Sequence, residues 1–600
     1  MRQFDNSALA NAARELLTQG DAVGAERVLA PVFDQLKLDP SVLHLMGLIK
    51  KAQNQLEDAE RHLRSAIAYS LSEGSYYNEL GVVLQIRGKY EEALKVFRAA
   101  AALMGGSPAV RGNIVRCLMA AGNLAEAERE AQAIVAARPS PEAWTLLSQV
   151  QRFQEREEDA LRSTEAALKL APSDRTLRYN YASSLDKVGR SAEALEGYER
   201  LARQSLDTPD LALAFARALY ANERKQDAEA VAEQGVEAWP TSVALHAALA
   251  RMRWLRGEGE ACTALIEAEI ARTPQNLSLR LACADALHRG KQLVKALDVL
   301  DRALRLAPDM PALLTAFGIV LDELDRPSDG LKALRRVVEI SSGARSAYRN
   351  LITTLMRAGQ PDEALRVTRT LQQEEPDEQF LIACEASALR MLGDRAYREL
   401  CDYDRLVREY DVATPRGFFT TESFNATLAG HLRIQHKTNA HPLDQTLPNG
   451  TQTERNLLLW DERTVKMFMG GADVAVRDYI KRLDDDSLHP LNRRKSKHYR
   501  YAKLWSTRLG HEGHMPNHVH DRGWISSAYY VALMPAERPR DPKAGWLKFG
   551  EPNRAPAGCG AEKWIEPKLG KLVLFPSYFW HGAVPFEGGE RLSLAFDVIP

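Results

Sequence analysis

Histidines near the C-terminal end of the chain have spacings that suit a bound metal ion. His518 and His520 are one residue apart in PNHVHDRGW, and His581 follows in FPSYFWHGAVPF. Side chains at positions i and i+2 of a strand point to the same side, so both imidazoles could reach one ion. A third histidine from a neighbouring strand would complete three ligands on one face and leave other coordination positions of the ion open. We therefore predict that His518, His520 and His581 are metal ligands and catalytic residues.

A basic residue that could bind a carboxylate follows the last of these histidines. Arg591 lies ten residues after His581, and Ser593 lies two residues after Arg591. A planar guanidinium can bind a carboxylate through two parallel N–H groups. Ser593 would share the face of Arg591 on a strand and could donate its hydroxyl to the same ligand. We predict a carboxylate-binding site at Arg591, with Ser593 beside it.

The segments PNHVHDRGWISSAYYV, GKLVLFPS and HGAVPFEGGERLSLAF resemble the iron(II)- and 2-oxoglutarate-dependent oxygenases. They look closest to a bacterial branch with an HxH…SxxYY pattern, and are similar overall to prolyl-hydroxylase domains. The resemblance implies Fe(II), 2-oxoglutarate and O2 as cofactor and cosubstrates, with Arg591 as a catalytic-site residue that holds the far carboxylate of 2-oxoglutarate. It also implies that a tyrosine of the YY pair contacts that carboxylate, and alternation along the strand favours Tyr530, which points with Ala528, over Tyr529. The reaction most common in the family is hydroxylation of a C–H bond.

The first histidine pair departs from the pattern of the family. Where His-x-Asp or His-x-Glu is usual, this chain has His518-Val519-His520, and Asp521 is the nearest carboxylate. On a regular strand Asp521 would point away from the face of His520, although a bulge could turn it back. We favour the three-histidine set over a set in which Asp521 joins His581 and one histidine of the pair. A further alternative is that one of the pair only orients the other.

The segments that carry these residues have the pattern of short β-strands. From about residue 498 the chain contains apolar or alternating runs without helices between them, bounded by Gly and Pro. These runs are HYRYAKLWSTRL, SSAYYVALM, GWLKFG, KLVLFPS and RLSLAFDVI. They predict an antiparallel sandwich, a double-stranded β-helix of the jelly-roll or cupin-like type, with its core at about 498–600. We place the whole oxygenase domain at 413–600, with helices first, and a junction helix at 401–412.

The first four hundred residues repeat with a period of 34 residues. Small residues recur at this step, with one step of 33, at Ala25, Ala59, Ala93, Ala127, Ala160, Ala194, Ala228, Cys262, Ala296, Gly330 and Ala364. Prolines lie twelve residues after many of them, where they would end a second helix. The segment GKYEEALKVFRAA, with Gly81 before it, resembles the tetratricopeptide repeat. The resemblance implies an all-α superhelix of about eleven units over 1–400, whose concave surface binds peptides or proteins.

The balanced composition argues against partners attracted by bulk charge, although local charged patches are still open. The chain has 79 Lys and Arg against 80 Asp and Glu, so bulk charge gives no attraction to nucleic acid or to a membrane surface. The six cysteines form no CxxC pair, which favours buried thiols in a reducing compartment. No signal-peptide pattern and no apolar run of the ~20 residues that span a bilayer are present. We expect a cytoplasmic protein that binds neither nucleic acid nor membrane.

These observations predict an α + β multidomain protein, with an all-α array followed by a β domain with flanking helices. The leading hypothesis is a 2-oxoglutarate- and Fe(II)-dependent dioxygenase that hydroxylates a side chain of a peptide or protein recruited by the array. One alternative is a non-catalytic scaffold with a metal-binding barrel. Another is a three-histidine dioxygenase that does not use 2-oxoglutarate.

Overall fold

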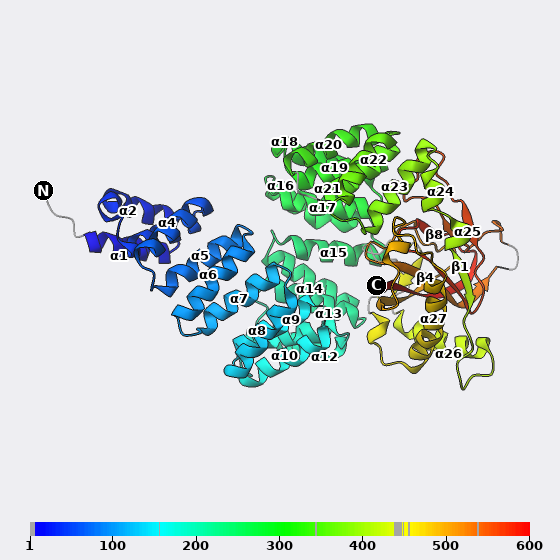
Figure 1. The fold of residues 1–600 in the computed structure, drawn as a ribbon, viewed down its shortest axis with the longest axis horizontal. Helices are drawn as coiled ribbons and strands as arrows, with labels where there is room; N and C mark the ends of the chain where they lie inside the picture. The colour runs from blue at the N-terminus through cyan, green and yellow to red at the C-terminus, as the bar shows by residue number, and fades with distance from the viewer. Residues whose placement is uncertain are drawn as a thin grey trace. The chain divides into compact units, whose positions relative to one another are not determined.

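The computed structural model describes residues 6–600 except 155, 342–344, 437–446, 448, 454–455 and 537–538. The chain divides into two compact units, Met1–Ala228 and Glu229–Pro600, and each is described by itself (Figure 1). Among the described residues, no helix is both long enough and apolar enough to cross a bilayer.

The first unit consists of helices that follow one another through short turns. They are α1 (Asn6–Thr18), α2 (Ala22–Leu36), α3 (Pro40–Ala52), α4 (Leu56–Tyr69), α5 (Gly74–Ile86), α6 (Tyr90–Leu103), α7 (Pro108–Ala120), α8 (Leu124–Ala137), α9 (Pro141–Phe153), α10 (Glu157–Leu170), α11 (Arg175–Lys187), α12 (Ser191–Gln204), α13 (Pro209–Ala221) and the start of α14 (Lys225–Ala238). α8 ends two residues before Pro139, as expected from the missing N–H of proline.

The second unit continues the repeats before the β domain begins. Its helices are α15 (Val243–Arg256), η1 (Gly259–Thr263), α16 (Ala264–Arg272), α17 (Leu277–Arg289), α18 (Leu293–Leu306), α19 (Pro311–Glu323), α20 (Pro327–Ile340), α21 (Arg345–Arg357), α22 (Pro361–Gln372), α23 (Gln379–Leu392), α24 (Ala396–Leu400), α25 (Tyr403–Leu406), α26 (Thr421–Gln435), η2 (Leu457–Leu459), α27 (Arg463–Lys481) and η3 (Asn492–Arg494).

The small residues that recur every 34 residues lie where paired helices pack tightly. Ala93 and Ala296, for example, are fully buried. At Gly330 an added Cβ would lie 2.7 Å from the carbonyl oxygen of Gly318 on the preceding helix. Only a small side chain fits such a position, because interiors are close-packed and backbone cannot yield easily. The periodicity therefore reports helix packing, as predicted.

The β domain consists of two antiparallel sheets. Its strands are β1 (Arg408–Asp411), β2 (Gly450–Gln452), β3 (Arg500–Leu509), β4 (Ile525–Pro535), β5 (Leu547–Phe549), β6 (Lys563–Ile565), β7 (Lys571–Pro576), β8 (His581–Ala583) and β9 (Gly588–Ile599). The larger sheet has the order β1-β7-β4-β9-β3-β2, and the smaller has the order β6-β5-β8. The prediction of an all-α repeat array followed by an antiparallel β domain is confirmed, while the jelly-roll connection stays a prediction.

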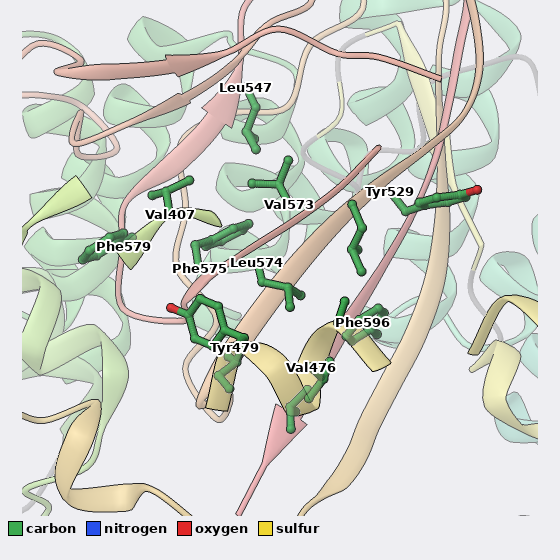
Figure 2. Packing of buried hydrophobic residues seen from close by; sticks show 14 of the residues in the cluster. Val407, Val476, Tyr479, Tyr529, Leu547, Val573, Leu574, Phe575, Phe579 and Phe596 are labelled. Carbon is green, nitrogen blue, oxygen red and sulfur yellow. The ribbon is translucent and has the colours of Figure 1, made fainter. Parts of the chain in front are cut away.

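One face of the larger sheet is covered by helix α27. Phe468 of this helix packs on Tyr529 with ring centroids 4.6 Å apart, and on Phe596 at 6.3 Å. Figure 2 shows Val476 and Tyr479 of the same helix against this layer of buried side chains. Because side chains alternate along a strand, the neighbours of Tyr529 and Phe596 must point to the opposite face. That opposite face carries the candidate site.

The junction was predicted as a helix over 401–412, and this prediction is wrong for its second half. Residues Tyr403–Leu406 form the short helix α25, but Arg408–Asp411 form strand β1, which pairs with β7. The phenol of Tyr410 donates to Asp478, and the backbone of β1 extends the larger sheet by one strand. The interstrand hydrogen bonds between β1 and β7 therefore stabilise an extended conformation here, in spite of the local preference for a helix.

Candidate metal and cosubstrate site

The three predicted ligands come together although they lie on different segments. His518 and His581 form an isolated antiparallel bridge, with N–O distances of 2.9 and 3.0 Å in the two directions. His520, two residues on, points to the same side as His518. One ring nitrogen from each residue lies within 4.8 Å of the others. Gly582 is required beside them, because a Cβ there would lie 2.8 Å from the carbonyl oxygen of Met515.

Each imidazole is oriented through its Nδ1 atom, which faces a hydrogen-bond acceptor. The acceptors are the carbonyl oxygen of Pro516 for His518 at 2.9 Å, that of Phe579 for His581 at 2.9 Å, and Oδ1 of Asp597 for His520 at 2.5 Å. A neutral imidazole that donates from Nδ1 carries its lone pair on Nε2. The three rings are thus held in the tautomer that a metal ligand requires.

The geometry of the three rings fits a metal ion. Nε2 of His518 lies 3.1 Å from Nε2 of His520, so two lone pairs face each other. Two nitrogen ligands at ~2.1 Å from one ion and at right angles would lie about 3.0 Å apart. Burial lowers the pKa of His518 to about 4 and holds the pKa of His581 well below its ordinary value, which keeps both rings neutral. Neutral, converging imidazoles are the form that binds iron(II).

Asp597 is a site residue that the sequence did not reveal. Its Oδ1 accepts hydrogen bonds from Nδ1 of His520 and from Oγ of Ser526, the latter at 2.7 Å. Ser526 also contacts Oγ of Ser577 at 2.8 Å. The available signal was the alternation Arg591, Ser593, Ala595, Asp597, which places the carboxylate on the same face of β9 as the predicted carboxylate-binding site.

Asp521 is turned away from the three rings. Its Oδ2 accepts from Arg349 of α21 at 2.8 Å, and its side chain remains about half exposed. Sets in which Asp521 replaces a histidine would require this ion pair to break and the side chain to reverse. The carboxylate nearest to the three rings is instead that of Asp597, which reaches them only through His520.

Arg591 is buried and carries a charge without an anionic partner among the described residues. Its Nη1 donates to the carbonyl oxygen of Gly545 at 2.8 Å, and its Nε has no hydrogen-bond partner in the described part of the chain. Burial lowers the pKa of this guanidinium. A buried cation is costly unless it is paired, so this position fits an anionic ligand.

The groups around Arg591 also have unused hydrogen-bonding capacity. The guanidinium lies 5.1 Å from the ring centroid of Tyr530, whose buried hydroxyl has Arg591 as its polar neighbour but no well-formed hydrogen bond within the described residues. Tyr530 is opposite Ser593, and Ser593 is opposite Thr507, on three adjacent strands. The Thr507 hydroxyl is likewise buried and unpaired among the described residues. Sequence reasoning missed Thr507, since its place depends on the pairing of β3 with β9.

Ser593 lies on the same face of the sheet as Arg591, whereas Tyr529 lies on the opposite face. Within the described residues, Ser593 makes a single long hydrogen bond, 3.4 Å, to the carbonyl oxygen of Thr507, so its hydroxyl could turn to a ligand. Tyr529 lies on the opposite face of the sheet and donates to Asn425 of α26 at 2.8 Å. Its direction agrees with the alternation expected for the YY pair.

Aromatic rings enclose the histidines on two sides. Phe575 lies 4.6 Å from the ring of His581, and Phe549 lies 6.3 Å from it, measured between centroids. Trp505 of β3 lies 5.4 Å from His520. These walls limit access of water, which strengthens electrostatic interactions inside the site.

Comparison with protein families agrees with both parts of the chain. Residues 503–597 match the family described as "Putative 2OG-Fe(II) oxygenase". Two tetratricopeptide-repeat models match residues 84–150, and residues 44–108 and 260–311. The chain therefore carries tetratricopeptide repeats and a C-terminal domain of this oxygenase family. No curated protein matches the sequence.

Similar solved structures are repeat proteins. A tetratricopeptide-repeat protein from Parabacteroides merdae is 17% identical with a TM-score of 0.33, over 39% of this chain and 92% of that one. Yeast Tom70 is 11% identical with a TM-score of 0.37, over 66% of this chain and 98% of that one. A thermophilic repeat protein from Thermus thermophilus is 20% identical with a TM-score of 0.26, over 30% and 98%. Likenesses at this level carry no argument about function.

Proposed function

We propose that the chain is a 2-oxoglutarate- and Fe(II)-dependent dioxygenase that hydroxylates a side chain of a peptide or protein. The observation that carries this proposal is one strand face, that of β9. On this face, the carboxylate of Asp597 orients His520, one of the three proposed metal ligands. Six residues earlier on the same face, Arg591 is buried and has no anionic partner among the described residues.

Roles for the residues follow from their contacts. His518, His520 and His581 would hold Fe(II) through their Nε2 atoms, because their Nδ1 atoms are already engaged. Arg591 would bind the far carboxylate of 2-oxoglutarate through Nε and the remaining Nη group, with Tyr530 and Ser593 donating hydroxyl hydrogens. When bound, the iron and 2-oxoglutarate supply oxidation by O2, with release of CO2 and succinate and insertion of one oxygen atom into a C–H bond.

The protein side chains position these groups and shield His581 from solvent. Asp597 fixes the ring of His520, and the backbone carbonyls of Pro516 and Phe579 fix the other two rings. Phe575 and Phe549 shield His581 from solvent. Preorganisation of this kind holds reacting groups in place and excludes competing reactions.

The repeats support a macromolecular substrate, since stacked helix pairs offer an extended surface for a peptide or protein. The side chain of the substrate that is hydroxylated would then lie near the three histidines, which follow the repeat array in the chain.

Succinate formation tests the enzyme class. The full chain, supplied with Fe(II), 2-oxoglutarate and air, should form succinate, and His581→Ala should abolish this. The matched control is His511→Ala, which removes a histidine outside the cluster and should leave succinate formation intact. A chain that binds metal yet forms no succinate would be a scaffold. Oxygen consumption that is independent of 2-oxoglutarate and survives Arg591→Met would indicate the other type of three-histidine dioxygenase.

The substrate is tested separately by mass spectrometry. Peptides and proteins that copurify with the full-length His581→Ala variant should gain ~16 Da, one oxygen atom, when the wild-type chain, Fe(II) and 2-oxoglutarate are added. Turnover of a small metabolite, with no mass change in any captured peptide, would contradict a peptide substrate and leave the enzyme class intact.

A further inference from the structure

The residue next to each histidine ligand is tied, directly or through one loop, to the last helices of the repeat array. Trp580 precedes His581, Asp521 follows His520, and Asn517 precedes His518. The segment from Gly510 to Trp524 contains two of the ligands and is held to the β domain by backbone hydrogen bonds, for example from Trp524 to the carbonyl oxygen of Val598 at 2.8 Å and from Ala583 to that of Met515 at 2.9 Å. Side chains next to the ligands add contacts to the repeat array.

Trp580 anchors the segment of His581 on α23. Its indole Nε1 donates to Oγ of Ser387 at 3.0 Å and lies 3.4 Å from the carbonyl oxygen of Ala383. Its ring meets Phe380 edge to face, with centroids 6.1 Å apart. The side chain is buried, so these contacts are shielded from water. Although it neighbours a ligand, Trp580 points to the array and away from the three rings.

Asp521 anchors the segment of His520 on α21 and α23. Its carboxylate accepts from Arg349 at 2.8 Å, and its carbonyl oxygen accepts from the backbone N–H of Gln379 at 3.4 Å. Arg349 is itself held by Glu378 at 3.0 Å and by stacking over the ring of Phe380 at 4.0 Å. A cation fixed by several partners makes a firmer ion pair than a free surface pair.

The loop after β5 ties the segment of His518 to α19. Arg554 in this loop forms ion pairs with Asp322 at 2.9 Å and Glu323 at 2.6 Å, and both carboxylates are largely buried. Asn517 donates to the carbonyl oxygen of Pro552 in the same loop at 3.4 Å. The loop therefore forms a bridge from the array to the third ligand-bearing segment.

We propose that helices α19–α23 of the repeat array are part of the metal centre, and that Arg349, Ser387 and Arg554 are positioning residues for its histidines. The inference rests on the metal role given to the histidines under the proposed function. It adds that the array does more than recruit a substrate: a peptide or protein that displaces these helices on binding would alter metal affinity. By thermodynamic reciprocity, metal binding would alter the affinity for that partner.

Metal affinity of the full chain tests the inference without any catalysis. We expect the Arg349→Ala/Arg554→Ala double variant to bind Co(II) about tenfold or more weakly than wild type in calorimetry, since loss of groups that orient ligands typically costs roughly 10–100-fold. The visible absorption bands of bound Co(II) should also shift. The matched control is Arg335→Ala, which removes an ion pair with Glu363 inside the array and should change neither quantity.

A charge exchange separates positioning from general destabilisation. Arg349→Ala should weaken Co(II) binding, and the exchanged pair Arg349→Asp/Asp521→Arg should restore it in part. Wild-type Co(II) affinity and spectrum in the Arg349→Ala/Arg554→Ala variant would overturn the inference. If that variant does not fold, the measurement moves to Trp580→Phe, which keeps an aromatic ring but loses the donor to Ser387. Unchanged Co(II) affinity and spectrum in Trp580→Phe would then overturn the inference. Failure of the wild-type chain to bind Co(II) would overturn the proposed function as well, so the two failures are distinguishable.

Discussion

Replacing Arg591 by methionine should change stability and cosubstrate binding in opposite directions. Methionine keeps most of the apolar volume of the side chain and removes the buried charge. An unpaired buried ion costs several kcal/mol. Removing it leaves the carbonyl of Gly545 unpaired, at a cost of about 1–3 kcal/mol. Without 2-oxoglutarate, we therefore expect Arg591→Met to gain stability on the order of 1 kcal/mol.

The same substitution should nearly abolish binding of 2-oxoglutarate. Hydrogen bonds to a charged partner contribute about 1.5–3 kcal/mol each. Losing two of them corresponds to roughly 10²–10⁴-fold in dissociation constant. Anaerobic calorimetry on the Co(II)-loaded chain measures the affinity, and a thermal melt of the chain without 2-oxoglutarate measures the stability.

Arg433→Met is the matched control for both measurements. Its guanidinium is paired with the buried carboxylate of Glu590 at 2.5 Å, so its loss should lower stability and leave 2-oxoglutarate affinity unchanged. If Arg591→Met lowers the melting temperature and keeps wild-type affinity, Arg591 is a structural cation, and the assignment of the carboxylate site is wrong.

Two further predictions concern buried polar groups. Asp597→Ala should weaken Co(II) affinity about 10–100-fold, because Nδ1 of His520 loses its charged acceptor and keeps only the hydroxyl of Ser526 at 2.9 Å. Asp597→Asn should weaken it less, since the amide oxygen still accepts, and calorimetry giving wild-type affinity for Asp597→Ala would contradict this. His436, buried between the hydroxyls of Thr451 and Ser506, has its pKa lowered by burial from 6.5 to about 4. Its folded form resists protonation, so its contribution to stability is fully present above about pH 6.5 and decreases as the pH falls toward about 4, by up to about 3 kcal/mol. Urea unfolding at neutral pH and near pH ~4.5 should show a smaller loss in His436→Gln than in wild type, and equal losses would refute the reasoning.

Local patterns in the sequence were sufficient to predict the histidines and the direction of the tyrosine pair. The spacing of His518 and His520 and the two-residue alternation of β4 depend only on neighbouring residues. Alternation along β4 puts Tyr530 and Tyr529 on opposite faces of the sheet, and the resemblance to the oxygenases indicated which of the two lies on the side of Arg591. The 34-residue repeat was predictable for the same reason, because tight packing of each helix pair requires a small residue at the same position of every repeat.

Contacts between distant segments could not be predicted in this way. The direction of Asp521 is set by Arg349, which lies 172 residues earlier in the chain. Asp597 can accept hydrogen bonds from His520 and Ser526 only because β9 pairs with β4 and His520 lies next to both strands. Strand β1 was mistaken for helix because its extended form depends on pairing with β7, about 160 residues later.

The departure from the usual His-x-Asp pair has a physical explanation in Asp597. A carboxylate that binds the metal directly would reduce the positive charge at the ion. In the proposed site His520 takes the place of that carboxylate, and the negative charge of Asp597 lies on the far side of its ring, 2.5 Å from Nδ1. A carboxylate at that place makes the imidazole more basic and draws its proton toward Oδ1, so part of the charge reaches the metal through the ring. If this reasoning holds, Asp597→Asn should alter the Co(II) spectrum even where affinity is largely kept, because the amide preserves the geometry and removes the charge. An unchanged spectrum in that variant would show that Asp597 only orients His520.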